Sequence, residues 1–146
     1  MKICLCGSIA FFDEMLNVKK ELESLGHEVK LPPNEVENKH GEMVDVREYY
    51  RLRQDTSDEM SWVWTAKEKA IRCHFNKIEW SEVILVLNYD KRGVEGYVGG
   101  NTLMEMGLAL HLNKKIFLWK NIPELSYKEE ILGMKPVVVN EDISRI

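Results

Sequence analysis

The sequence contains no apolar run long enough to cross a bilayer, which takes about 18 to 20 consecutive apolar residues. Met1 and Lys2 lead directly into a short strand-like run, and nothing there resembles the apolar core of a signal peptide. We therefore expect a cytoplasmic protein with no membrane partner.

Cysteine is scarce, with Cys4, Cys6 and Cys73 as the three copies and no CxxC pair among them. This count excludes a disulfide framework and a cysteine zinc site. Cys4 and Cys6 lie on one face of an expected strand, where small buried apolar groups are the expected role. His27, His40 and His111 show no metal-ligand spacing with each other or with a carboxylate pair, so we expect no metal. We also expect no organic cofactor.

Positive charge is not in excess, because 24 acidic residues stand against 20 basic ones and the formal net charge is −4. Binding to a nucleic-acid polymer depends on surplus Lys and Arg and is not expected. A length of 146 residues with 45% hydrophobic content fits a single domain, 1–146, that acts on a small molecule.

Several familiar catalytic motifs are also missing. The chain has no GxxxxGK[ST] loop for triphosphates, no GxGxxG fingerprint after the first expected strand and no GxSxG elbow. Kinase, dehydrogenase and acyl-hydrolase functions are therefore disfavoured.

Short apolar runs alternate with helical patterns along the chain. The run Val83–Leu87 is apolar at every position, which is typical of a strand buried on both faces in the centre of a parallel sheet. The pattern predicts a three-layer, Rossmann-like α/β fold with an open, doubly wound sheet of about five parallel strands. Expected strands are 3–6, 28–31, 83–87, 116–119 and 137–139, and expected helices are 11–25, 62–80, 101–113 and 124–132.

Residues 34 to 61 form a polar stretch that is too long for an ordinary connection. We expect either a partly helical insertion or a mobile lid. Four of its residues, Arg47, Tyr49, Tyr50 and Arg51, could close over a base or a phosphate, although such charged stretches are more often a solvated surface.

Ligands of this kind of fold bind at the carboxyl ends of the strands. Two loops qualify, the first being Gly7-Ser8-Ile9 and the second running from Asn88 to Thr102. The amides of Gly7 and Ser8 and the Ser8 hydroxyl suit a phosphate or carboxylate, although small residues there also serve a plain tight turn.

Glu105 is the only carboxylate in an expected helix that is apolar almost all round. Thr102-x-x-Glu105 can be a capping box, in which the Glu side chain only completes the helix start. Alternatively, Glu105 stands at the ligand edge behind glycines and attacks an anomeric carbon to form a covalent ester. His74 shares a stripe with apolar residues and is either a core histidine or a catalytic group.

These residues resemble the nucleoside 2-deoxyribosyltransferase-like family, which includes deoxyribonucleoside 5′-monophosphate N-glycosidases. The resemblance rests on Cys6-Gly7-Ser8-Ile9, on the central strand, on Thr102-x-x-Glu105-x-Gly107 and on Lys114-Lys115-Ile116. A weaker resemblance, to cytokinin-type phosphoribohydrolases, rests on the stretch Gly99-Gly100-Asn101-Thr102 with Glu105.

The resemblance implies a flavodoxin-like sheet, a homodimer or higher homo-oligomer and cleavage of an N-glycosidic bond in a nucleoside or its 5′-monophosphate. It implies that Glu105 is the nucleophile and that Gly7-Ser8-Ile9 lines the sugar or phosphate end. Gly100 and Asn101 replace the Asp and Gly of the family motif, and His74 stands where the glycosidases have an acidic residue. Proton delivery to the base therefore falls to His74, to Asp90 or to neither.

We expect an enzyme that cleaves or transfers at such a bond, with Glu105, His74 and Asp90 as catalytic candidates. The substrate-binding candidates are Cys6, Gly7, Ser8, Ile9, Asn88, Gly99, Gly100, Asn101 and Thr102. The first alternative is a nucleotide-binding or sensing module without turnover. The second is a structural subunit in which Glu105 only caps its helix.

Overall fold

A five-stranded parallel sheet forms the centre of the computed structural model, which describes residues 1–146. Its strand order is β2-β1-β5-β6-β7, the 2-1-3-4-5 order of flavodoxin-like sheets when only these strands are counted. The fold class expected from the sequence is confirmed. The strands are β1 (Lys2–Cys6), β2 (Glu28–Lys30), β5 (Val83–Val86), β6 (Lys115–Leu118) and β7 (Val137–Val138).

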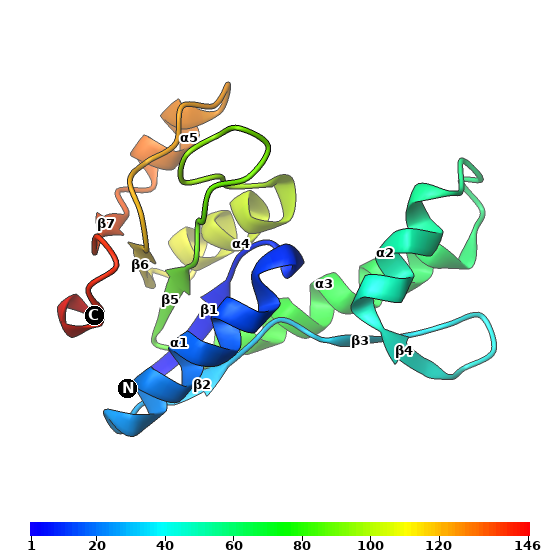
Figure 1. Ribbon diagram of the computed structural model, residues 1–146, viewed down its shortest axis with the longest axis horizontal. Coiled ribbons are helices and arrows are strands. Elements are labelled where there is room, and N and C mark those ends of the chain that lie inside the picture. The colour runs from blue at the N-terminus through cyan, green and yellow to red at the C-terminus, as the bar shows by residue number, and fades with distance from the viewer.

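Helices cover both faces of this sheet and complete the three layers (Figure 1). Helix α1 (Phe12–Ser24) packs on one face, and α3 (Trp62–Trp80), α4 (Gly100–His111) and α5 (Lys128–Gly133) pack on the other. None of the helices is both long enough and apolar enough to span a membrane.

Successive side chains of β1 point to opposite faces of the sheet and so belong to two separate core clusters. Ile3 and Leu5 face α1, whereas Cys4 and Cys6 face α3 and α4. All four side chains are fully buried, as are most of those of the central strand β5. The cysteines of β1 therefore act as small core residues, as the sequence predicts.

The N-terminal caps of α3 and α4 differ in kind. Ser61 is the N-cap of α3, and its Oγ accepts a hydrogen bond from the Val63 amide at 3.4 Å. Helix α4 instead begins at Gly100, with Gly99 as an N-cap that has no side chain to offer. Thr102 thus lies inside the first turn, and of the two alternatives for Glu105 the capping box with Thr102 is wrong.

Helix α4 is also less buried than its sequence predicts. Met104 and Leu110 are about half exposed, while Met106 and Ala109 are buried against the sheet. The apolar circumference of this helix therefore exceeds the area that the sheet covers.

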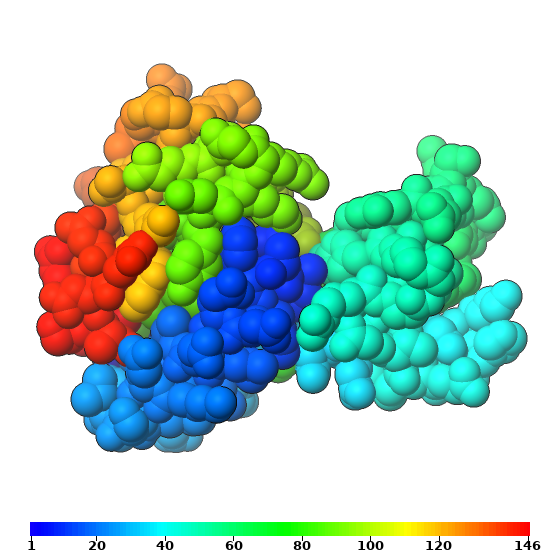
Figure 2. Space-filling view, viewed as in Figure 1, coloured from blue at the N-terminus to red at the C-terminus, as the bar shows by residue number.

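Residues 34–61 form an arm that projects from the main body (Figures 1 and 2). It contains a hairpin of β3 (Glu35–Glu37) and β4 (Met43–Asp45), followed by α2 (Val46–Gln54). The helical part was expected, but the hairpin was not. The arm packs on the first turns of α3 through a small core of its own, made of Val36, Val46, Tyr49, Val63 and Ala66.

Candidate active site

A cavity of about 540 Å³ lies at the carboxyl ends of β1 and β5, where the strand order reverses. The main body and the arm both contribute walls, and Figure 2 shows the notch between them. This volume suits a nucleotide-sized ligand. Of the residues predicted from sequence, those lining the cavity are Gly7, Ser8, Ile9, Arg47, Tyr49, Tyr50, His74, Gly99, Gly100, Asn101, Thr102 and Glu105.

The turn after β1 forms one wall. Gly7 is required there, because a Cβ at this position would lie 3.0 Å from both the Leu87 carbonyl oxygen and the Met15 side chain. The Ser8 hydroxyl accepts hydrogen bonds from the Ala10 amide at 3.4 Å and from Lys91 Nζ at 2.7 Å. Burial, and then the neighbouring Arg92, lowers the pKa of Lys91. A basic group thus sits directly on the predicted phosphate end.

Glu105 lies one turn inside α4, and its side chain is only 12% exposed. Its Oε1 is 3.7 Å from His74 Nε2, and its buried Oε2 has no hydrogen-bond partner. Burial raises the pKa of the carboxyl from 4.5 to about 8, although a hydrogen bond with Cys6 and the charge of Lys67 pull it down. A buried carboxyl that lines a cavity and has one oxygen without a hydrogen-bond partner is a candidate for chemistry.

His74 and Cys6 are buried neighbours of the Glu105 carboxyl. The His74 Nε2 lies 3.6 Å from the Cys6 Sγ, and its Nδ1 is buried without a partner. Burial, then the charge of Lys77, lowers the pKa of His74 to about 3. The imidazole is therefore neutral at pH 7, so the proton of the His74–Glu105 pair resides on the carboxyl.

Cys6 does not line the cavity but lies beneath it. Burial is the main reason that the pKa of its thiol stays well above the usual value, with Cys4 and Glu105 raising it further. The ligand atoms of Cys4, Cys6 and His74 lie within 4.8 Å of one another, a spacing that one metal ion could bridge. A metal ion there would have to displace the protons of both thiols, because a metal binds the thiolate form.

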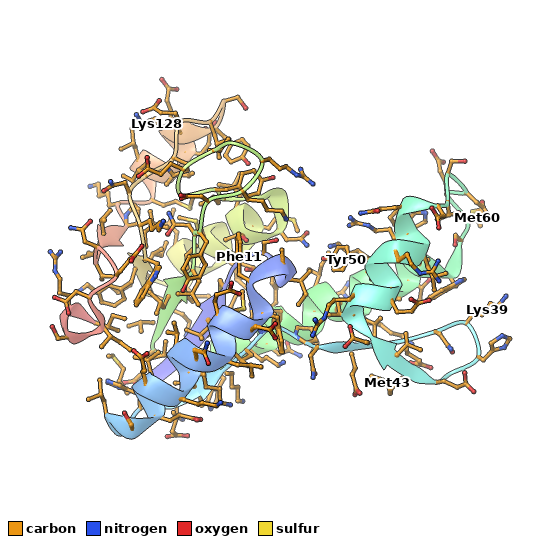
Figure 3. The ribbon with its side chains drawn as sticks, viewed as in Figure 1. Phe11, Lys39, Met43, Tyr50, Met60 and Lys128 are labelled. Carbon is orange, nitrogen blue, oxygen red and sulfur yellow. The ribbon has the colours of Figure 1, made fainter.

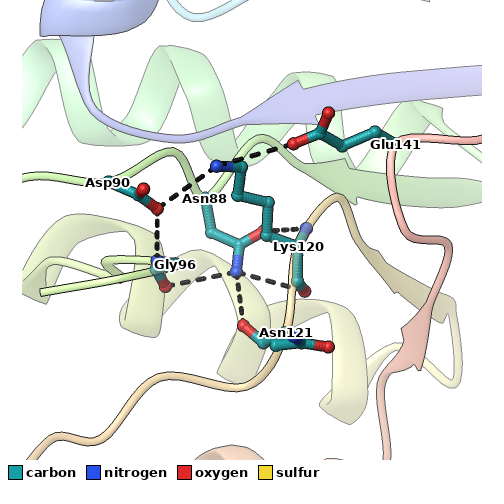
Figure 4. A network of polar contacts seen from close by, with 6 residues as sticks. All are labelled: Asn88, Asp90, Gly96, Lys120, Asn121 and Glu141. Atoms are coloured by element: carbon teal, nitrogen blue, oxygen red, sulfur yellow. Dashed lines mark hydrogen bonds and ion pairs between the residues drawn. The ribbon is translucent and has the colours of Figure 1, made fainter.

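Asn88 is outside the cavity and holds the loop that follows β5 (Figure 4). Its Nδ2 donates to the carbonyl oxygens of Gly96 and Asn121 at 3.2 and 3.0 Å, and its Oδ1 accepts from the Lys120 amide at 2.8 Å. Its side-chain oxygen and nitrogen are both engaged, so in this structure Asn88 supports the loop and does not line the cavity.

Asp90 is also outside the cavity. Its Oδ1 accepts a hydrogen bond from the Gly96 amide at 2.9 Å and lies 3.3 Å from Lys120 Nζ (Figure 4). The Gly96 amide, and then Lys120, lower the pKa of Asp90. An ionised carboxylate engaged elsewhere is not placed to protonate a leaving base.

The arm supplies the other wall. Tyr50 points from α2 toward the main body (Figure 3), and its hydroxyl lies 3.4 Å from both Lys67 Nζ and Asn101 Nδ2. Arg53 lines the cavity as well, whereas Arg51 does not, since it pairs with Glu48 on the surface.

Four basic residues of the site escaped prediction. Arg53 was recoverable, because it follows Tyr50 by three residues on the same face of a helix. Lys91 and Arg92 lie in the loop from Asn88 to Thr102 that the sequence analysis named, whereas Lys67 carries no local signal, since only the folded chain brings it to the cavity.

Comparison with solved structures found two similar enzymes, and the likeness to the first shows a shared fold. The CMP N-glycosidase BcmB of Clostridium botulinum matches with a TM-score of 0.50 and 15% identity, over 96% of this chain and 90% of that one. A 2-deoxyribosyltransferase from Bacillus psychrosaccharolyticus matches with a TM-score of 0.46 and 21% identity, over 82% and 72%. No family model matches the sequence, and a search of curated proteins found no match.

Both of these enzymes are of the family that the sequence motifs resemble. At 15% identity, the likeness to BcmB concerns the fold, and the resemblance is confirmed at that level.

Proposed function

We propose that this protein cleaves or transfers at the N-glycosidic bond of a nucleoside or deoxynucleoside, or of its 5′-monophosphate. The single observation that carries the proposal is Glu105, a buried carboxyl that lines the cavity at the switch point of the sheet and has one oxygen without a partner. The fold shared with a CMP N-glycosidase is compatible with this chemistry.

In the proposed mechanism, the ionised Glu105 attacks C1′ of the sugar. The C1′–N bond breaks, its electron pair leaves with the base, and an ester joins the sugar to Glu105. Water or a second nucleobase then attacks C1′, and the Glu105 carboxylate is released. Attack by water gives hydrolysis and attack by a base gives transfer.

The reaction uses the carboxylate form of Glu105. With a pKa of about 8, about one carboxyl in ten is ionised at pH 7 in the free protein. Lys67 favours this form through its charge. His74 and Cys6 are neutral, and we assign them the role of holding the carboxyl group in place.

The base must gain a proton as it leaves. Neither His74, whose pKa is about 3, nor Asp90, which lies outside the cavity, suits this role. The proton therefore comes from water or from another group that lines the cavity.

The nucleotide-binding module without turnover remains the second candidate. The observation that favours it is the raised pKa of Glu105, because most of the carboxyl groups are protonated, and not nucleophilic, at neutral pH.

To test the proposal, the protein is incubated with ribo- and deoxynucleosides and their 5′-monophosphates, and the free base is measured by chromatography. The parent protein should release base from at least one of them, and Glu105→Gln should abolish the release. Glu95→Gln, which changes an exposed glutamate, should leave it unchanged. Binding without release from any substrate would favour the sensing module, and full activity in Glu105→Gln would exclude the mechanism.

A further inference from the structure

Four basic side chains line the cavity without an acidic partner. Arg53, Lys67, Lys91 and Arg92 form no ion pair within 4.0 Å, whereas Arg47 pairs with Asp45 at 3.6 Å. Only two carboxylates, Asp13 and Glu105, line the cavity, although acidic residues outnumber basic ones in the chain. The cavity is therefore a positive region on a negatively charged protein, which favours an anionic ligand.

The first pair of cations gathers around Tyr97, in the loop after β5. Lys91 Nζ and the Arg92 guanidinium lie 5.7 and 5.8 Å from the centre of its ring. Lys91 also donates to Ser8, and Arg92 lies 3.4 Å from the Tyr97 hydroxyl. This pair stands at the end of the cavity that the proposed function assigns to the sugar phosphate.

The second pair gathers around Tyr50, on the wall that the arm provides. The Arg53 guanidinium lies 4.4 Å from the centre of the Tyr50 ring, and Lys67 Nζ lies 5.4 Å from it. Lys67 and Asn101 both approach the Tyr50 hydroxyl at 3.4 Å. These contacts with the ring and hydroxyl hold both cations at the cavity wall without neutralising them.

A phosphate monoester carries up to two negative charges, which the pair at Tyr97 can balance alone. The pair at Tyr50 comes from different elements, α2 and α3, and lies on a different wall. With the phosphate beside Ser8 and C1′ at Glu105, the base extends toward the arm. Arg53 and Lys67, which form no ion pair, then face the substituents of the base.

We propose that Arg53 and Lys67 form a second anion subsite, so that the preferred ligand is a nucleotide with a further acidic group on its base side. This inference rests on the proposed function for the orientation of the nucleotide. The acidic group is a carboxylate on the base, which a guanidinium and an ammonium group can bind together.

Calorimetry with a matched pair of nucleotides tests the subsite. Orotidine 5′-monophosphate differs from uridine 5′-monophosphate by one base carboxylate, whereas uridine 3′,5′-bisphosphate carries its second acidic group on the sugar and serves as the control for added charge. Binding is measured on the Glu105→Gln protein, which keeps the ligands intact. We expect orotidine 5′-monophosphate to bind about tenfold more tightly than uridine 5′-monophosphate, as one desolvated charge contact allows.

Three further substitutions in this protein locate the preference. Arg53→Gln should remove the tenfold difference, whereas Arg92→Gln should weaken all the nucleotides and keep the ratio. Arg51→Gln, on the same helix but outside the cavity, should change neither. A gain with orotidine 5′-monophosphate and not with the bisphosphate supports a subsite on the base side, whereas an equal gain with the bisphosphate would contradict that placement.

The subsite is refuted if orotidine 5′-monophosphate binds no more than about twofold tighter than uridine 5′-monophosphate, including the case in which neither binds, or if Arg53→Gln leaves the ratio intact. Release of base by the parent protein is a separate readout. The proposed function can therefore fail while the subsite stands, and the reverse also holds.

Discussion

Replacing Glu105 by glutamine is expected to change how the stability of the protein depends on pH. In the folded chain, burial raises the pKa of this carboxyl to about 8, against 4.5 for the ordinary group. Since the folded state opposes ionisation, the contribution to stability is fully present below pH 4.5. It is lost as the pH rises toward and through 8. Glutamine stays neutral and experiences no such loss.

The size of the effect follows from the two pKa values. Each unit of difference corresponds to about 1.4 kcal/mol, so the whole shift corresponds to about 5 kcal/mol between acid and alkaline pH. Between pH 5 and pH 8 the parent protein should lose about 3 kcal/mol more than Glu105→Gln. At pH 5 the two proteins should have similar stability, because the carboxyl is then protonated in the folded chain.

Urea unfolding at pH 5, 6, 7 and 8, followed by the fluorescence of the four tryptophans, measures this difference. Other groups titrate over the same range, so the readout is the gap between parent and variant. Glu95→Gln serves as the control, since it removes an exposed carboxylate. Parallel curves for parent and Glu105→Gln across this range would refute the argument that burial holds Glu105 protonated.

Three other predictions concern activity and the loop after β5. As pH rises, kcat/KM should increase to a plateau with a midpoint near 8, because the nucleophile is the carboxylate; a decrease would identify Glu105 as an acid instead. Lys67→Met should move this midpoint to higher pH, since the charge of Lys67 lowers the pKa of Glu105; an unchanged midpoint would contradict that coupling. Gly96→Ala should cost more than about 2 kcal/mol in urea unfolding, because its Cβ would lie 2.6 Å from the Asn121 carbonyl oxygen at a φ of +66°. Gly93→Ala has a similar φ of +72° but open space, so it should cost only about 1 kcal/mol, and equal losses would show that strain and not contact decides.

The sheet could be predicted from sequence because apolar runs and their breaks carry the information. Val83–Val86 is buried on both faces, and an uninterrupted apolar run is what such a strand needs. The Ser61 cap of α3 was predictable because its hydroxyl acts on amides only two residues away.

The N-terminal cap of α4 was not predictable from the same local rules, although the expected start at residue 101 is one residue from the observed one. Gly99 caps the helix without a side chain, so the chain shows no polar signal there. The Thr102-x-x-Glu105 spacing instead matched a capping box by residue type alone. Burial of the carboxyl against Cys6 and His74 is a tertiary effect that no four-residue pattern contains.

The hairpin in the arm also escaped prediction. Its strands are three residues long, and each has a single valine, Val36 or Val44, facing the small core. One apolar residue cannot establish a period of two. The pairing depends on α2 and α3, which lie later in the chain.

The most direct test of the central claim is the mass of the trapped ester. A 2′-fluoro-arabino nucleoside 5′-monophosphate slows the second step of a retaining glycosidic mechanism, and the digested protein is then examined by mass spectrometry. We predict an added glycosyl phosphate mass on the peptide that contains Glu105. Release of free base without an adduct, or an adduct on another residue, would contradict the assignment of Glu105 as nucleophile.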